Sequence, residues 1–150
     1  MTDLIEVRVS NLVGAPLDWA VAKVLGWRMV RVPSDIDGNN GGEVLAPPDF
    51  SKDFQFPPRG AVPVGYFLRR WSTDWSQGGP LIDKHHGSAQ HFHGLVEDAC
   101  YSGGPAGADA WSYGPTALVA FCRGLVRYKL GDTVQVPKEL WHNSAMQIAC

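Results

Sequence analysis

This sequence has no long hydrophobic run, few cysteines and no strong excess of one charge. No apolar run approaches the roughly 18 residues that a membrane-spanning helix needs, so we expect no membrane partner. Only three cysteines occur in 150 residues, an odd number whose spacing fits neither a disulfide framework nor a zinc site. The formal net charge is −2. A nucleic-acid partner is therefore not expected either, because it requires a basic surface.

The cysteines and the first residues together indicate a compartment. The opening residues, MTDLIEVRVS, carry none of the basic and apolar regions of a secretory signal. We therefore expect a cytoplasmic protein whose thiols, at Cys100, Cys122 and Cys150, stay reduced. Cys122 lies within an apolar helical pattern, and we predict that it is a core residue.

The composition that is present is that of an ordinary globular protein. Hydrophobic residues make up 45% of the chain and charged residues 19%. A length of 150 residues suits one domain, spanning 1–150, with a core of its own. The 17 glycines and 11 prolines are numerous, but they are too few to indicate a disordered chain.

The first part of the chain predicts two strands, one helix and a long irregular segment. Residues 4–9 alternate between apolar and polar side chains, as a half-buried strand does. Apolar residues at helical spacing, with a proline at the start and a glycine just past the end, predict a helix over 16–25. We interpret 27–32 as a strand. Residues 33–63 hold six prolines and four glycines, which predicts a long loop or insertion with a short strand at 43–46.

The second part of the chain contains the strongest helical pattern. It opens at 114–115, ends at Gly131, and its apolar arc covers more than half of the helix, which is typical of a central, buried helix. The remaining face holds small residues, among them Ala120 and Gly124, that let another backbone approach closely. The other predicted elements are strands at 65–71, 91–97, 111–113 and around Val134 and Val136, a glycine-rich loop at 101–110, and a short helix from Pro137 to Trp141.

This order of elements predicts the fold class. Two helices among several separated strands indicate an α+β domain rather than a regular βαβ array. We expect two main helices packed on a small, mostly antiparallel sheet, with the long Gly/Pro-rich loop at 33–63 outside it.

Three blocks of sequence occur together in one order. They are GAPLDWAVAK at 14–23, STDWSQGGPLI at 72–82, and YGPTAL from 113, which runs on to KLGDTVQVP at 129–137. In order and content they resemble the NinX-like family of small phage and prophage proteins. The resemblance implies a phage origin and a setting in the cytoplasm of a bacterial host. It implies no reaction and no catalytic residue.

The chain departs from the family pattern at two places. Residues 33–63 look like an insertion. Residues 83–86, Asp-Lys-His-His, stand where the family tends to show acidic and basic residues. A role shared by the whole family therefore does not follow for the histidines.

Four histidines within nine residues are a candidate metal site. They are His85, His86, His91 and His93. In an extended strand the last two point to the same face, and the first two could join them across a hairpin, with Asp83 as a carboxylate ligand. No recognised zinc signature is present. The alternative is a polar strand and turn that hold histidines without binding a metal.

The segment 72–80 is a candidate ligand site. It combines small polar side chains, two glycines and Trp75. Backbone N–H groups freed by glycine cradle anions, and a tryptophan ring stacks on planar ligands. The N–H groups at the start of the helix near 114–116 also favour an anion. The candidate ligand-binding residues are Ser72, Thr73, Asp74, Trp75, Gln77, Gly78, Gly79, Gly114, Thr116 and Arg123.

The same segment has a purely structural interpretation. Asp74 followed by Gln77 resembles a capping box, and Gly78 would end the helical turn at once. In this interpretation Trp75 is a buried core anchor, and turn chemistry alone explains the segment.

Arg123 and Arg127 lie four residues apart on one helix, where like charges repel slightly. A bound anion could compensate for them, as could Asp18, Asp74 or Asp109. The alternative is that Arg127 is solvated and Arg123 pairs with a carboxylate of the fold.

Aromatic residues suggest an interface. Trp19 lies nearly opposite the apolar stripe of its helix, so it either packs beneath the long loop or takes part in a subunit contact. Homo-oligomers are common, and we expect a dimer. The candidate interface residues are Trp19, Phe50, Phe54, Phe56 and Trp141.

No catalytic constellation appears. The sequence holds no hydrolase elbow, dinucleotide fingerprint or helix-turn-helix, and no cofactor is expected. We therefore hypothesise a non-enzymatic phage accessory protein that binds an unknown phage or host protein. The alternatives are a small-ligand or anion-binding domain, with or without catalysis, and a metal-binding protein that uses the four histidines.

Overall fold

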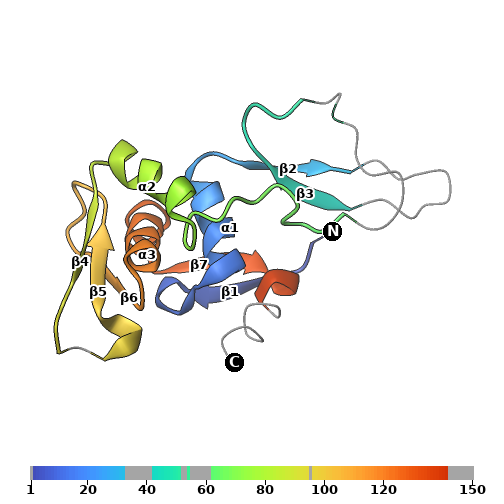
Figure 1. Ribbon diagram of the computed structural model, residues 1–150. Coiled ribbons are helices and arrows are strands. Elements are labelled where there is room, and N and C mark those ends of the chain that lie inside the picture. Colours follow the sequence, from blue (N-terminus) through green and yellow to red (C-terminus); the bar gives the residue numbers. More distant parts are fainter. Residues whose placement is uncertain (1, 33–41, 52–53, 55–61, 95, 142–150) are drawn as a thin grey trace.

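The fold is built around one helix, α3 (Ala117–Leu130), which Figure 1 shows between a three-stranded sheet on one side and α1 (Gly14–Val24) on the other. The α+β class is confirmed, with the strands divided among three small antiparallel sheets. This computed structural model describes residues 2–32, 42–51, 54, 62–94 and 96–141.

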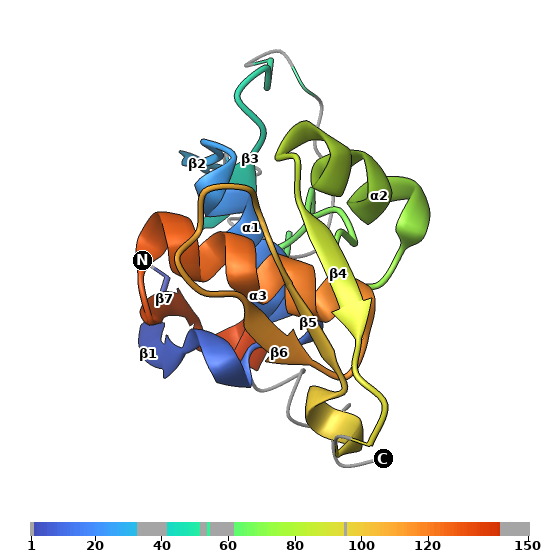
Figure 2. The same ribbon diagram turned by 90° about the vertical axis from the view of Figure 1, so that its left-hand side faces the viewer.

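The three-stranded sheet lies across α3, as Figure 2 shows. Its antiparallel strands, in order, are β4 (Ser88–His91), β5 (Tyr101–Gly104) and β6 (Ser112–Gly114). Backbone packs on backbone here: a Cβ added to Gly124 would lie 2.3 Å from the carbonyl oxygen of Gly103, and one added to Gly103 would lie 2.8 Å from the nitrogen of Phe121. The prediction that small residues let another backbone approach this helix is confirmed.

The opposite side of α3 packs through large side chains. Leu17 and Val21 of α1 are fully buried, as are Leu125 and Val126 of α3. A second sheet closes this side and contributes Val134 and Val136 to the core. It pairs β1 (Leu4–Arg8) with β7 (Thr133–Pro137) in an antiparallel register that sets Ile5 opposite Val136 and Val7 opposite Val134. The predicted strands and both predicted main helices are confirmed here, and 138–141 are helical as expected.

A third sheet lies above α1 in Figure 1. It pairs β2 (Arg28–Arg31) with β3 (Glu43–Ala46), so the short strand predicted inside the 33–63 segment is confirmed. Residues 33–41, 52–53 and 55–61 of that segment lie outside the described residues. The amide of Leu45 donates to the carbonyl of Val64 at 3.1 Å, which fixes the end of the segment beside β3.

Helix α2 (Trp75–Lys84) corrects the prediction that Gly78 ends the helical turn. The helix continues through Gly78, Gly79 and Pro80. A Cβ on Gly78 would lie 2.2 Å from the carbonyl oxygen of Trp71 and 2.6 Å from a methyl carbon of Leu118. The absent side chain therefore serves close packing of α2 on α3, and this tertiary contact overrides the low helix propensity of glycine.

Three further predictions of secondary structure are wrong. Residues 65–67 lie in a turn and 68–70 form no regular structure, with the amide of Leu68 bonded to the carbonyl of Gly65 at 3.0 Å. The predicted strand at 91–97 lies instead at β4 and stops at His91, ahead of Gly94 with its φ of +90°. Within the predicted loop at 101–110, the first four residues form β5.

Two short helical turns complete the described chain, η1 (Val9–Asn11) and η2 (Glu97–Ala99). No helix among the described residues has both the length and the apolar character needed to cross a membrane. Cys122 is fully buried, as predicted.

Candidate functional site

In the predicted ligand-binding segment at 72–80, polar groups form hydrogen bonds with one another. Asp74 caps α2: its Oδ1 accepts from the backbone N–H of Ser76 at 2.9 Å and from the Ser76 hydroxyl at 2.7 Å. These two bonds hold the pKa of Asp74 below its usual value. The prediction that Asp74 caps a helical turn is therefore confirmed. Trp75 is 59% exposed, so its assignment as a core anchor is wrong.

The reciprocal half of the capping box does not form. The side-chain oxygen of Gln77 accepts from the backbone N–H of Arg70, upstream of the cap. Thr73 is exposed, while Ser72 is buried and donates its backbone N–H to Oδ1 of Asp18 at 2.9 Å. Two of the three blocks that resemble the NinX-like family thus meet at a hydrogen bond between α1 and the chain before α2.

Asp18 is the buried carboxylate of this region, with 5% of its surface exposed. Burial raises the pKa of Asp18 to about 6, against the bonds from Ser72 and the charge of Arg70, which lower it. It lines a pocket of about 460 Å³ together with Arg69, Arg70 and Thr73. The signal in the sequence was a single acidic residue inside an otherwise apolar helical stretch, which is rarely buried without a partner.

The helix start at 114–116 is closed. The Thr116 hydroxyl oxygen caps α3 by accepting from the backbone N–H of Val119 at 3.1 Å. Gly114 lies against the backbone of Ala120, where an added Cβ would be 2.9 Å from nitrogen. None of the three pockets described for this structure is lined by both 72–80 and 114–116.

The two arginines make different contacts. Arg123 is buried, and its Nε and Nη1 donate to the carbonyl oxygens of Leu12 and Tyr113 at 2.8 and 2.9 Å. Arg127, which was predicted to be solvated, is exposed and forms an ion pair with Asp132 at 2.8 Å.

Both arginines line a second pocket, of about 610 Å³, that the sequence did not reveal. Arg8 joins them from the end of β1. The remaining lining residues are Val9, Ser10, Ala99, Trp111, Ser112, Tyr113, Asp132 and Thr133.

The four histidines are not gathered into a metal site among the described residues. His85 is half-buried at the end of α2, and burial, followed by the charges of Lys84 and Lys129, lowers its pKa. The ring of His91 packs edge-on against Tyr101, with ring centres 5.0 Å apart. No group of three or more His, Cys, Asp or Glu side chains in the described part of the chain is placed to hold a metal ion. The strand that was to align His91 with His93 ends at the first of them.

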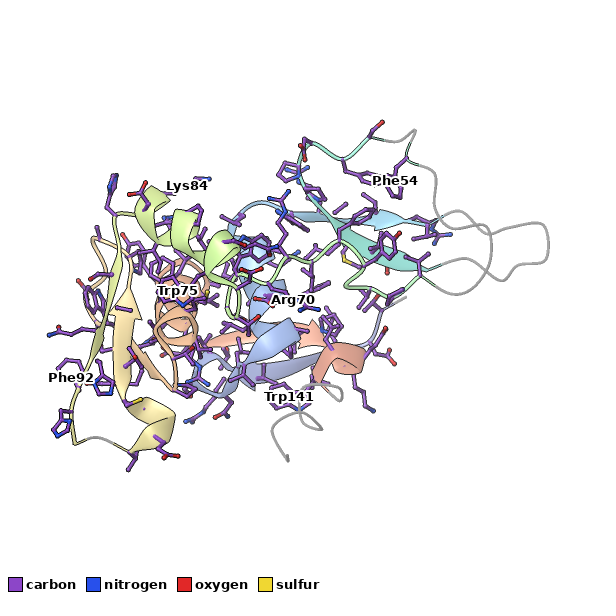
Figure 3. All side chains as sticks on the ribbon, in the orientation of Figure 1. Phe54, Arg70, Trp75, Lys84, Phe92 and Trp141 are labelled. Atoms are coloured by element: carbon purple, nitrogen blue, oxygen red, sulfur yellow. The ribbon has the colours of Figure 1, made fainter. Side chains whose placement is uncertain are left out.

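The predicted interface residues do not form one patch. Trp19 is 3% exposed and belongs to the core. Phe50 and Phe54 pack on Phe67, with ring centres 5.4 and 5.2 Å apart. In Figure 3 Phe54 lies beside the β2–β3 pair, far from Trp141 below it. Phe56 lies outside the described residues.

An apolar groove runs beside Trp19, with a volume of about 540 Å³. Leu4 and Leu130 stand on it, 47% and 44% exposed. Two charged side chains, Lys23 and Glu43, also line the groove, and Glu43 accepts from the backbone N–H of Thr2 at 3.3 Å. The other lining residues are Thr2, Trp19, Ala20, Met29, Val134 and Gln135.

Comparison with known proteins does not assign this chain to a family. No family model matches the chain, and no curated protein matches it. The resemblance to the NinX-like family stays a prediction from the three sequence blocks.

Proposed function

We propose that the protein is a non-enzymatic accessory protein of a phage or prophage that acts by binding a protein of the phage or its host. The apolar groove is the observation that carries this proposal. Exposed leucines that flank a concave apolar surface are typical of a protein-binding site, since isolated monomers rarely leave such surfaces in water.

The edge of β7 defines how the partner binds. Within the described residues β7 pairs only with β1, and Val134 and Gln135 of β7 line the groove. A strand with one unpaired edge presents backbone N–H and C=O groups to an extended peptide. The occupant that fits is an extended segment of a partner protein, paired with β7 and carrying apolar side chains at alternate positions.

The side chains that line the groove indicate which residues the partner segment carries. The apolar floor accepts an aliphatic or aromatic anchor between Leu4 and Leu130. Such anchors carry most of the binding free energy in small interfaces, and polar neighbours at the rim set orientation. Lys23 is exposed, so a carboxylate near the anchor would be favoured at this rim.

The test begins with a photo-crosslinking amino acid at Gln135 in the full-length protein, expressed in infected host cells. We expect a crosslink to one protein species. The crosslinked segment is then made as a peptide, and its affinity for the purified protein is measured. Leu130→Asp should weaken that peptide at least tenfold, because a carboxylate replaces an apolar contact.

Val96→Asp is the matched control, because Val96 is 72% exposed and does not line the groove. It should leave the affinity unchanged. Equal loss in both variants, or no crosslink from position 135, would overturn the proposal. A native mass spectrum completes the test: a dimer that Leu130→Asp abolishes would show that a second copy of this chain, rather than a partner, pairs with β7.

A further inference from the structure

The pocket that contains three arginines is separate from the groove and calls for a different ligand. Arg8, Arg123 and Arg127 line it, with Asp132 as the one acidic side chain among the lining residues. The lining therefore carries an excess of two positive charges on a chain whose net charge is −2. Local concentration of one charge in a concave site attracts ligands of the opposite charge.

The fold assembles this pocket from four parts of the chain. The antiparallel register of β1 and β7 sets Arg8 opposite Thr133. The backbone N–H of Val9 then donates to the carbonyl of Asp132 at 2.9 Å and fixes the turn that follows α3. One helical turn along α3 separates Arg123 from Arg127, which places both on the same side of the helix.

Arg123 provides the rigid part of the site. It is 8% exposed, and two hydrogen bonds to backbone carbonyls hold its guanidinium group in place. Arg8 and Arg127 are exposed and stand above it. Planar guanidinium groups match the oxygens of phosphate with paired N–H donors. Hydroxyl groups of Ser10, Ser112 and Thr133 line the same pocket and supply further donors.

Two aromatic residues also line the pocket. Trp111 and Tyr113 lie on either side of Ser112 at the start of β6, and Tyr113 is 55% exposed. Exposed aromatic rings next to a cationic site stack on flat ligands. The volume of about 610 Å³ falls within the range of small-molecule sites.

We propose that this pocket binds a phosphate monoester carried on an aromatic ring system, of the size and shape of a nucleoside monophosphate. The phosphate group lies against the arginines and the ring against Tyr113 and Trp111. The site binds this ligand without reaction, and it is independent of the protein-binding groove.

Isothermal titration of the full-length protein at low salt tests the proposal. The probes are AMP, ribose 5-phosphate, adenosine and inorganic phosphate. We expect AMP to bind at least tenfold more tightly than ribose 5-phosphate or phosphate, adenosine to bind weakest, and AMP affinity to fall as salt screens the arginines. Equal affinity for AMP and ribose 5-phosphate would overturn the role of the two rings. Absence of AMP binding at millimolar concentration would overturn the site.

Variants at exposed positions identify the pocket without disturbing the fold. Arg8→Gln and Arg127→Gln should each weaken AMP at least fivefold with an unchanged melting temperature. Asp132→Asn should tighten AMP severalfold, because it removes the carboxylate that competes for Arg127. Arg28→Gln and Asp83→Asn, at exposed positions of β2 and α2, are the matched controls and should change nothing. AMP affinity that is unaffected by all of the pocket variants would overturn the proposal.

Discussion

The two faces of α3 are packed in opposite ways. Toward α1 the contacts are made by large side chains such as Leu17, Val21 and Leu125, all fully buried. Toward the β4-β5-β6 sheet they are made by backbone, through Gly103 and Gly124. The side-chain face should be damaged by removing atoms and the glycine face by adding them. One helix therefore shows both ways in which close packing limits sequence.

The largest effect is expected on the side-chain face. Leu17→Ala should lower the free energy of unfolding by about 3 kcal/mol, because it removes buried methyl groups and leaves a cavity. Leu17→Met keeps the volume and should cost less than about 1.5 kcal/mol. Urea unfolding followed by circular dichroism measures both. If the two substitutions cost the same, volume is not what this face requires.

The buried carboxylate on the same face gives a pH-dependent effect. The pKa of Asp18 rises from 3.8 to about 6 on folding, so the folded protein holds this proton more tightly than the unfolded chain. Its contribution to stability is present below pH 4 and is lost as the pH rises through 6, by about 3 kcal/mol in total.

Asp18→Asn isolates that contribution. The difference in unfolding free energy between wild type and Asp18→Asn should shift by about 2 kcal/mol in favour of the variant between pH 4 and pH 7. Urea titrations at half-unit pH steps measure it. Leu17→Met, which changes no titratable group, is the control and should show no such trend. A difference that is independent of pH would mean that the side chain is solvated in the folded protein.

The glycine face is tested by adding one methyl group. Gly124→Ala should cost about 2 kcal/mol, because the new Cβ would lie 2.3 Å from the Gly103 carbonyl oxygen, and overpacking outweighs the gain in helix propensity. Gly79→Ala is the matched helical control: its Cβ meets only a Trp75 ring carbon at 3.8 Å, so it should stabilise by up to about 1 kcal/mol. Thermal unfolding of the pair distinguishes close packing from a general intolerance of alanine.

The smallest effect is expected at Thr116, the residue that caps the start of α3. Thr116→Ala removes the hydroxyl that accepts from Val119 and should cost about 1 kcal/mol. Thr116→Ser keeps that bond and should cost much less. Differential scanning calorimetry of the two variants is the measurement, and equal losses would show that the methyl group, rather than the cap, is what matters.

Local sequence patterns were sufficient for elements whose periodicity and boundaries agree. Helix α3, β1, and even the short β3 inside the long segment were predicted. The errors arose where tertiary contacts override local preference. Gly78 continues α2 because it packs on Trp71 and Leu118. Gly103 lies in a strand that packs on α3 so closely that a side chain at this position would collide with the helix.

The candidate sites show the same limit. Arg123 could be singled out by its spacing from Arg127, since helical spacing is local. Arg8 and Trp111 could not be joined to it, because nothing local shows that the end of β1 and the start of β6 lie beside α3. The histidines were grouped by closeness in sequence, but β4 ends at His91, so the predicted strand does not align His91 with His93.

Cys122 lies in α3 and is fully buried, so the reactivity of its thiol reports internal motion of the core. Its thiol is inaccessible, and desolvation raises its pKa, so the nucleophilic thiolate is suppressed in the folded protein. An alkylating reagent can reach it only when α3 separates from a neighbour. In a protein with Cys100 and Cys150 replaced by serine, the rate of alkylation therefore measures how often the core opens.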